Sequence, residues 1–421
     1  MTLPDPAPSA KAPAPFIRAP ARALAIALAI AVLIACILLW RQAGDPPPIR
    51  IGVLHSQTGT MAVSEQPLIA AVELAVDEIN AAGGLLGRRI EAVVADGRSD
   101  PAVFAAEAER LIDREHVAVL FGCWTSACRQ AVKPVIEARR HLLFYPVQYE
   151  GMEQSPHILY TGAAPNQQIL PGARWALQTF GKRVYLLGSD YVFPRTANRI
   201  LRDLIEANGG QVLAERYLPL GAADFAPVIA DLHHHRPDIV LSTINGDSNG
   251  AFFDALVAAQ LHEQPLMSFS AAEPEMHRWG GGRLTRHYGT WSYFQSLVSE
   301  SNTRFVQQFR QRLGPEAVTS DPIKAAYNGV LLWADTVRTV RSAETVRVNG
   351  NSLLRASRAD PGGIVAVDAA SRHLWKRVRI GQVMPDGQFH ELYASQSLIR
   401  PTPWPSYRSR EAWRQLTGGV P

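Results

Sequence analysis

Cysteine is scarce in this sequence, and its scarcity excludes several classes of protein. The 421 residues include three cysteines, Cys36, Cys123 and Cys128. Three are too few for the disulfide framework of a small secreted domain, and their spacing does not match that of a metal site. Cys123 and Cys128 are close enough for a disulfide in an oxidising compartment, but the residues between them must also form a turn and a helix start. We therefore expect two separate buried thiols.

Charge is also sparse, and what there is lies mostly at one end. Charged residues make up 19% of the chain against 47% hydrophobic residues, a composition typical of a globular protein with a large core. The formal net charge is +4. Residues 1–50 account for most of it, because they contain five basic residues and only two acidic ones, Asp5 and Asp45. The basic residues are Lys11, Arg18, Arg22, Arg41 and Arg50. The nearly neutral remainder has no cluster of basic and aromatic residues, which argues against nucleic-acid binding.

The one long apolar run lies near the N-terminus. Residues 23–40 form 18 uninterrupted apolar residues between Arg22 and Arg41. That length favours an uncleaved membrane anchor, with residues 1–22 on the cytoplasmic side. Two alternatives stay open: lipidation at Cys36 after cleavage of a lipoprotein signal, or an ordinary cleaved signal peptide. In each case the body is delivered outside the cytoplasm, and the proline-rich residues 41–48 act as a stiff linker.

Strand-like and helix-like segments alternate along the rest of the chain, which is long enough for two packed lobes. Buried-strand patterns occupy 49–54, 90–95, 117–121, 184–187, 211–217 and 238–242, each followed by helical spacing of apolar residues. Strands separated by helices predict an α/β fold with parallel sheets covered by helices on both faces. Ligands of such sheets bind at the carboxyl ends of the strands, so the turns after the strands are the place to look for a site.

Four of those turns carry groups that suit a small polar ligand. In the first turn Gly122 exposes its backbone, Trp124 supplies an aromatic wall, and Thr125 and Ser126 place hydroxyls at a helix start. Ordinary helix capping by Thr125 or Ser126 is an alternative role for those hydroxyls. The other three turns are residues 144–149, which include Tyr145 and Val147, residues 188–194, which include Tyr191, and residues 245–249.

Taken together, these turns resemble the urea and short-chain amide receptors of ABC transporters, relatives of the amide-sensing regulators of amidase operons. The resemblance runs in the same order from about residue 49 to residue 405. It rests on Phe-Gly-Cys-Trp-Thr-Ser (121–126), Phe-Tyr-Pro-Val-Gln-Tyr-Glu-Gly (144–151), Tyr-Thr-Gly-Ala-Ala-Pro-Asn-Gln-Gln (160–168), Gly-Ser-Asp-Tyr-Val-Phe-Pro-Arg (188–195), Asn-Gly-Asp-Ser-Asn (245–249), Trp-Ser-Tyr-Phe-Gln-Ser (291–296) and Leu-Trp-Lys-Arg-Val-Arg-Ile-Gly (374–381).

The resemblance implies a type I periplasmic-binding-protein fold with two lobes and a ligand between them. Lobe 1 would hold residues 49–164 and 292–345, and lobe 2 residues 165–291 and 346–421, including a C-terminal tail. Ser126 and Tyr145 match positions that bind the amide from lobe 1, and Tyr191 matches one that closes from lobe 2. The implied partners are the amide and the permease subunits of an ABC transporter. No cofactor or metal is implied.

The chemistry of urea suggests a further ligand residue, Asp247. Urea has one carbonyl acceptor and four N–H donors, and each unpaired group in a dry cleft costs about 1–3 kcal/mol. A carboxylate accepts from both amino groups at once, so Asp247 suits urea better than it suits acetamide. The alternative role for Asp247 is to form the turn or cap the helix before Ser248. Glu273, in the turn after residues 266–269, is the reserve acceptor.

Two other functions remain open at this point. An amidohydrolase could use Ser126, Tyr145 and Asp247 together, but none of the four turns contains a histidine to act as a base. The three consecutive histidines 233–235 lie at the end of a predicted helix, where a solvated helix end is a simpler explanation than a metal site. A membrane-anchored sensor of amides is favoured over a transport receptor if the apolar run at 23–40 is retained.

Overall fold

The computed structural model describes residue 1, residues 24–34 and residues 46–417. The chain divides into two compact units, Met1–Pro47 and Pro48–Pro421, and each is described by itself. In the first unit, residues 24–34 are helical. Among the described residues, no helix combines the length and the apolar character that crossing a bilayer requires. The expected anchor at 23–40 is only partly described, and Cys36 lies outside the described residues.

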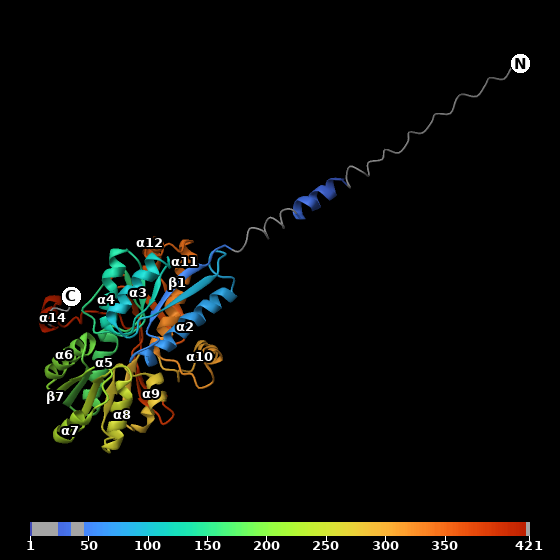
Figure 1. Ribbon diagram of the computed structural model, residues 1–421. Helices are drawn as coiled ribbons and strands as arrows, with labels where there is room; N and C mark the ends of the chain where they lie inside the picture. The colour runs from blue at the N-terminus through green and yellow to red at the C-terminus, as the bar shows by residue number, and fades with distance from the viewer. Residues whose placement is uncertain (2–23, 35–45, 418–421) are drawn as a thin grey trace. The chain divides into compact units, whose positions relative to one another are not determined.

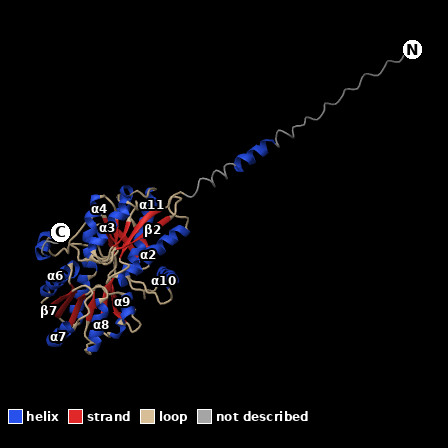
Figure 2. Ribbon diagram, in the orientation of Figure 1, coloured by secondary structure: helices blue, strands red, loops and turns tan. Residues whose placement is uncertain are grey.

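The second unit contains two sheets, each covered by helices, which we call lobe 1 and lobe 2 (Figures 1 and 2). The sheet of lobe 1 has eight strands in the order β11-β12-β13-β5-β4-β3-β1-β2. Its elements are β1 (Ile49–His55), α2 (Ala62–Ala81), β2 (Ile90–Asp96), α3 (Pro101–Asp113), β3 (Leu120–Gly122), α4 (Ser126–Ala138), β4 (Leu143–Tyr145), β5 (Ile158–Tyr160), α10 (Glu300–Leu313), α11 (Asp321–Val340), α12 (Thr345–Val348), α13 (Asn351–Leu354), β11 (Ser357–Asp360), β12 (Gly363–Asp368) and β13 (His373–Trp375).

The sheet of lobe 2 has seven strands in the order β15-β14-β10-β9-β8-β6-β7. Its elements are η1 (Pro165–Gln167), α5 (Ile169–Thr179), β6 (Arg183–Ser189), α6 (Val192–Ala207), β7 (Gln211–Leu218), α7 (Ala226–His235), β8 (Ile239–Thr243), α8 (Ser248–Ala258), β9 (Leu266–Ser268), α9 (Glu273–Trp279), η2 (Gly281–Arg283), β10 (His287–Trp291), β14 (Arg379–Val383), β15 (Phe389–Ala394) and α14 (Arg410–Thr417).

The burial of the central strands explains why runs of apolar residues predict them. β1 lies between β2 and β3 and pairs with both in parallel, helices α2 and α3 pack against it, and six of its seven residues are buried. Such a strand reads as a continuous apolar run. The same holds for β6 and β8 in lobe 2, where Val184, Leu186 and Leu241 pack on one face and Tyr185, Leu187 and Val240 on the other. The predicted strands at 49–54, 90–95, 184–187, 211–217 and 238–242 all coincide with strands of the structure.

Two predictions about the fold need correction. The sheets are mixed rather than parallel, because β11 and β12 pair antiparallel at the edge of lobe 1, and β14 and β15 do so at the edge of lobe 2. The boundary expected at residue 345 is also displaced, since β13 pairs with β5 and residues 357–375 therefore belong to lobe 1. The chain crosses between lobes at 161–168, at 292–299 and at 376–378. An edge hairpin can add to either sheet, and its own sequence does not say which.

The three cysteines are also not as expected. Cys123 and Cys128 form a disulfide with their Cα atoms 5.9 Å apart, where we expected two separate thiols. Cys123 lies directly after β3 with a positive φ of 66°, and Cys128 lies in the first turn of α4. That backbone turn brings the two side chains together, so the disulfide closes the loop that carries Trp124, Thr125 and Ser126.

Candidate functional site

The two lobes contact each other where the turns after their strands meet. Side-chain contacts between the lobes include Trp124 Nε1 to Asn245 Oδ1 at 3.4 Å, Ser64 Oγ to Glu275 Oε1 at 2.6 Å, Gln148 Nε2 to the Phe269 carbonyl at 2.9 Å, and the Thr60 hydroxyl to the Asp247 carboxylate. The lobe-1 members follow β1, β3 and β4, and the lobe-2 members follow β8 and β9. This is the carboxyl edge at which parallel sheets bind ligands.

On the lobe-1 side, the polar residues are organised around Arg129. Its guanidinium donates to Ser126 Oγ at 3.0 Å, to Glu150 Oε1 at 3.2 Å and to Glu153 Oε1 at 2.9 Å. The Ser126 hydroxyl donates in turn to the other oxygen of Glu150. Arg129 and Glu150 are both 0% exposed, so this is a fully desolvated ion pair in which each charge depends on the other.

Burial and Arg129 act in opposite directions on the two carboxylates. Burial raises the pKa of Glu150 above its usual value, even though Arg129 and Ser126 work to lower it. Burial also acts to raise the pKa of Glu153, but Arg129 and the Tyr160 hydroxyl together bring it below its usual value. Glu150 is therefore the more easily protonated of the two carboxylates that pair with Arg129.

Tyr145 of lobe 1 and Tyr191 of lobe 2 are the two predicted tyrosines of the site. The Tyr145 hydroxyl donates to the Trp124 carbonyl at 2.6 Å, which ties the end of β4 to the loop after β3. Burial raises the pKa of Tyr191 well above its usual value, and Tyr145 and Glu150 raise it further by their charge. Tyr145 and Glu150 of lobe 1 are therefore close enough to Tyr191 of lobe 2 to influence its hydroxyl electrostatically.

The other predicted residues have simpler structural roles. A Cβ atom at Gly122 would lie 2.1 Å from the Leu54 carbonyl oxygen, so the close approach of β3 to β1 requires glycine here. Thr125 is the N-cap of α4 and accepts from the Cys128 N–H at 3.1 Å, which is the alternative role considered for it. Val147 is buried in the core of lobe 1.

The two carboxylates proposed as acceptors both lie apart from this network. Asp247 is exposed; its side chain does not cap α8 but accepts from the Thr60 hydroxyl across the lobe contact. Glu273 is fully buried at the start of α9, and its Oε1 accepts from the Gln295 N–H at 2.9 Å. Burial raises the pKa of Glu273 to about 8. Its other oxygen has no hydrogen-bond partner among the described residues.

Sequence reasoning missed the charged residues at the centre of the site. Arg129 follows Ser126 by three residues and so shares its helix face, and Glu150 belongs to the quoted segment 144–151. His55 and Glu65 were also missed; His55 Nδ1 lies 3.0 Å from Glu65 Oε2, and both are buried. Charged residues are seldom fully buried unless paired, so only the pairing reveals their place.

Two features considered for other chemistry can be placed as well. Histidines 233–235 form the last turn of α7, as predicted, and Arg236 ends that helix in the left-handed conformation. Among the described residues, no three metal-ligating side chains converge. The hydrolase alternative was expected to lack a Gly-x-Ser-x-Gly motif, which is wrong, because Gly246, Ser248 and Gly250 have that spacing. Ser248 Oγ, however, has no hydrogen-bond partner among the described residues. A nucleophilic serine needs a base within hydrogen-bond reach.

Comparison with known proteins agrees with this architecture. Residues 49–410 match the family model described as periplasmic binding protein domain. Leu/Ile/Val-binding protein homolog 6 of Brucella abortus is 23% identical over 356 residues, which cover 81% of this chain and 90% of that protein. A shorter match, 32% identical over 117 residues, is to a limonene hydroxylase of Geobacillus stearothermophilus and covers 28% of this chain and 21% of that protein.

Solved structures show the same fold at low sequence identity. A solute-binding protein of an ABC transporter from R. palustris, in complex with 4-hydroxybenzoate, has a TM-score of 0.76 at 23% identity, covering 85% of this chain and 99% of that one. The LivJ protein of Streptococcus pneumoniae, in complex with isoleucine, has a TM-score of 0.72 at 18% identity, covering 84% and 100%. Because the family model spans most of the chain, this protein belongs to the periplasmic binding protein family, the extracytoplasmic solute-binding proteins of ABC transporters.

Proposed function

We propose that this protein captures a small uncharged amide between its lobes, with urea as the first choice, and delivers it to an ABC permease. The observation that carries the proposal is that Ser126 and Tyr145 are buried after strands of lobe 1, where Ser126 bonds to Arg129 and Glu150. Tyr191 of lobe 2 is partly buried and close enough for Tyr145 and Glu150 to raise its pKa. Hydroxyls and carboxylates can serve both the carbonyl and the N–H groups of an amide. A small ligand can satisfy both sets of groups only when the lobes are closed.

The charges of the network favour an uncharged ligand over a carboxylate. Arg129, the cation at its centre, is already held by Glu150 and Glu153. A benzoate or an amino-acid carboxylate would therefore meet Glu150 without an unpaired cation to offset it, and burying an uncompensated charge is costly. The related proteins in complex with 4-hydroxybenzoate and isoleucine bind ligands that do carry a carboxylate. We expect this chain to differ from them in ligand class.

Glu150, rather than Asp247, is the acceptor that the structure suggests for the N–H groups of urea. Glu150 is buried beside Ser126, whereas Asp247 is exposed and engaged by Thr60. In this proposal Glu150 accepts from the amide N–H groups, because a carboxylate has more lone-pair positions than its bonds to Ser126 and Arg129 use. Asp247 contributes by holding lobe 2 against Thr60, in the loop before α2 of lobe 1, at the rim of the site.

A titration of the purified body, residues 48–421, tests the ligand class directly. Urea, acetamide, formamide, isoleucine and 4-hydroxybenzoate are titrated by calorimetry, and urea should bind most tightly. Ser126→Ala should weaken urea binding by about five- to 150-fold, since one hydrogen bond in a closed site is lost. Ser301→Ala, which removes an exposed hydroxyl from α10, is the matched control and should change nothing. Tighter binding of either carboxylate than of urea would refute the proposal.

A sensor that signals through a membrane partner is the second candidate, because the apolar run at 23–40 is long enough to be retained as an anchor. We propose that the protein lies on the outer face of the cytoplasmic membrane, held by this segment or by a lipid on Cys36. Mass spectrometry of the mature protein distinguishes the two, since lipidation requires cleavage before Cys36. Affinity purification from membranes then separates the functions: recovery of permease subunits indicates transport. Release of ammonia from urea by the pure protein would indicate a hydrolase instead.

A further inference from the structure

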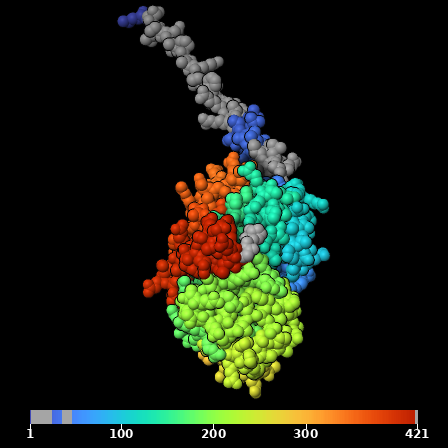
Figure 3. All heavy atoms as spheres, turned by 90° about the vertical axis from the view of Figure 1, so that its left-hand side faces the viewer, coloured from blue at the N-terminus to red at the C-terminus, as the bar shows by residue number. Residues whose placement is uncertain are grey.

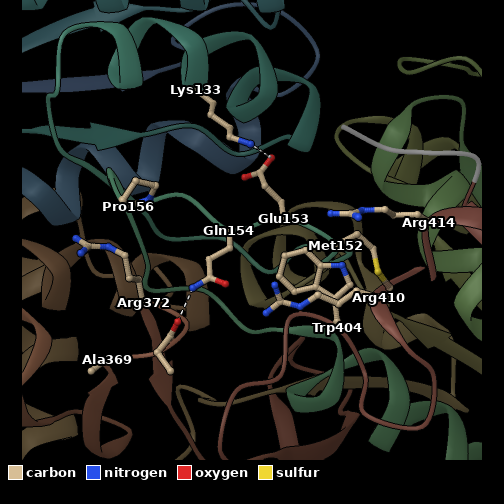
Figure 4. A pocket seen from close by; sticks show the side chains of 11 residues that line it. Lys133, Met152, Glu153, Gln154, Pro156, Ala369, Arg372, Trp404, Arg410 and Arg414 are labelled. Atoms are coloured by element: carbon tan, nitrogen blue, oxygen red, sulfur yellow. Dashed lines mark hydrogen bonds and ion pairs between the residues drawn. The ribbon is translucent and has the colours of Figure 1, made fainter. Parts of the chain in front are cut away.

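A separate cavity lies where the C-terminal segment meets lobe 1. Figure 3 shows this segment, in red, seated against lobe 2 and bordering lobe 1, and Figure 4 shows the cavity itself. The cavity has a volume of about 650 Å³. One wall comes from lobe 1, with Lys133 of α4 and Glu153. The other comes from Trp404 and from Arg410 and Arg414 of α14, the helix that anchors on lobe 2 through the buried Trp413.

Positive charge predominates among the residues that line the cavity. Arg410 stacks its guanidinium 4.3 Å above the Trp404 ring, and Arg414 has only an exposed and therefore weak pairing with Glu411 at 3.5 Å. Lys133 Nζ lies 4.0 Å from Glu153, too far for a hydrogen bond. Arg372 also lines the cavity, but its guanidinium is engaged by Asn349 and by the Ile158 carbonyl. Three cations are therefore available to an anion here.

Two buried polar atoms at the cavity have unused hydrogen-bonding capacity. Trp404 Nε1, a donor, has no partner among the described residues. Glu153 is 3% exposed; its Oε1 accepts from Arg129 and Tyr160, while its Oε2 has no hydrogen-bond partner among the described residues. The cavity thus presents cations and an N–H for anionic oxygens, together with one carboxylate oxygen that requires a donor. An anion that retains an O–H group satisfies all of these at once.

We propose that this cavity binds inorganic phosphate as the hydrogen phosphate ion. Lys133, Arg410 and Arg414 bind its anionic oxygens, Trp404 donates to one of them, and Glu153 Oε2 accepts the phosphate O–H. Phosphate has a pKa near neutral and keeps a proton at pH 7, whereas sulfate has none and would set its lone pairs against Glu153. The site thereby joins α4 of lobe 1 to α14 of lobe 2 through one small ion.

Calorimetric titration of the full-length protein with sodium phosphate and sodium sulfate, at pH 7 and equal ionic strength, tests the site. Phosphate should bind at least about tenfold more tightly than sulfate, because only phosphate supplies the donor for Glu153. Glycerol 3-phosphate forms a third arm: a monoester has a second pKa of about 6 and is mostly without an O–H at pH 7, so it should bind more weakly than inorganic phosphate. Tighter binding of the monoester would overturn the role given to Glu153. Equal affinity for phosphate and sulfate would overturn the proposal.

Charge-removing variants locate the binding to this cavity. Arg410→Gln and Arg414→Gln should each weaken phosphate binding by about tenfold, since each removes a charge-assisted contact from a partly exposed site. Lys133→Gln, on the opposite wall, should weaken phosphate binding equally. Because Lys133 is not part of α14, this variant shows that the loss of binding does not result from unfolding of α14. Arg338→Gln removes an exposed charge from α11 and is the control that should leave phosphate binding unchanged. Unaltered phosphate affinity in all three cavity variants would show that phosphate binds elsewhere, if at all.

Discussion

At the scale of single residues, several charged side chains are buried beside the candidate site. Arg129 pairs with Glu150 and Glu153. The ring centroids of Tyr145 and Tyr149 lie 4.9 and 4.5 Å from its guanidinium carbon. Removing one partner of such a pair leaves the other charged and buried, a loss of about 3–5 kcal/mol. The network is therefore rigid and well suited to orienting the Ser126 hydroxyl.

Glu273 provides a test of how burial controls protonation at this scale. Its pKa is about 8 in the folded protein, against an ordinary value of 4.5, so the folded state binds the extra proton between these values. The contribution of Glu273 to stability is thus complete below pH 4.5 and is lost as pH rises to 8, by about 1.4 kcal/mol per pH unit. The variant Glu273→Gln stays neutral and lacks this slope.

The comparison is made by guanidinium denaturation at pH 5, 6, 7 and 8, because urea is the proposed ligand. We expect Glu273→Gln to gain stability relative to the wild type as pH rises. Glu263→Gln changes an exposed carboxylate and serves as the control, with a curve parallel to that of the wild type. A parallel curve for Glu273→Gln would mean that Glu273 is ionised when buried.

At the scale of elements, the loop between β3 and α4 carries the largest share of the site. The disulfide between Cys123 and Cys128 closes it, and the Thr125 cap and the bond from Tyr145 to the Trp124 carbonyl hold it from either side. The loop is short, so its covalent closure restricts few unfolded conformations. Its value to the protein is chiefly that it limits where Trp124 and Ser126 can lie.

Replacing both cysteines by alanine should therefore affect binding and stability together, each modestly. A closed loop of this length contributes about 2 kcal/mol to the free energy of unfolding. We expect that loss in guanidinium denaturation, accompanied by weaker urea binding in calorimetry. Alkylation of the unreduced, denatured wild type, followed by mass spectrometry, verifies that the pair is oxidised. A double variant with wild-type affinity and stability would contradict a bracing role.

At the scale of the whole molecule, the arrangement is one of two rigid lobes joined by three crossovers. The C-terminal tail runs back along them, since Asn166 in the first crossover bonds the backbone of Arg400 and Thr402, and Lys376 in the third pairs with Ile399. Each lobe has its own buried core, so hinge motion at the crossovers disturbs neither. The contacts between Thr60 and Asp247 and between Ser64 and Glu275 close the opposite side.

Closure of the lobes by ligand gives a prediction for solution scattering. If only the closed state offers both halves of the hydrogen-bonding shell, saturating urea should select it and lower the radius of gyration. Small-angle scattering of residues 48–421 with and without urea measures the change. Asp247→Ala, which removes a closing contact outside the ligand shell, should show a larger radius without ligand and still contract with it. Identical curves, from protein shown to bind urea and to start without it, would mean that the lobes do not move.

Much of this protein was determined by local sequence. The buried strands β1, β6 and β8 are recognisable because a strand covered on both faces must be apolar along its whole length. Ser126, Tyr145 and Tyr191 lie at or just after the carboxyl ends of β3, β4 and β6, because side chains near a strand end are located by the strand itself.

Only the tertiary structure decided which of these residues act together. Asp247 satisfied every local criterion for an acceptor, yet it lies exposed against Thr60, because the position of a turn at the rim or in the interior depends on how the lobes meet. Arg129 and Glu150 read as surface charges in the sequence and are buried only because each neutralises the other. The edge strands β11 to β15 divide between lobes by long-range pairing, since an antiparallel hairpin fits either edge equally well. Local patterns specify elements, whereas burial of charge and choice of sheet edge depend on partners far apart in the chain.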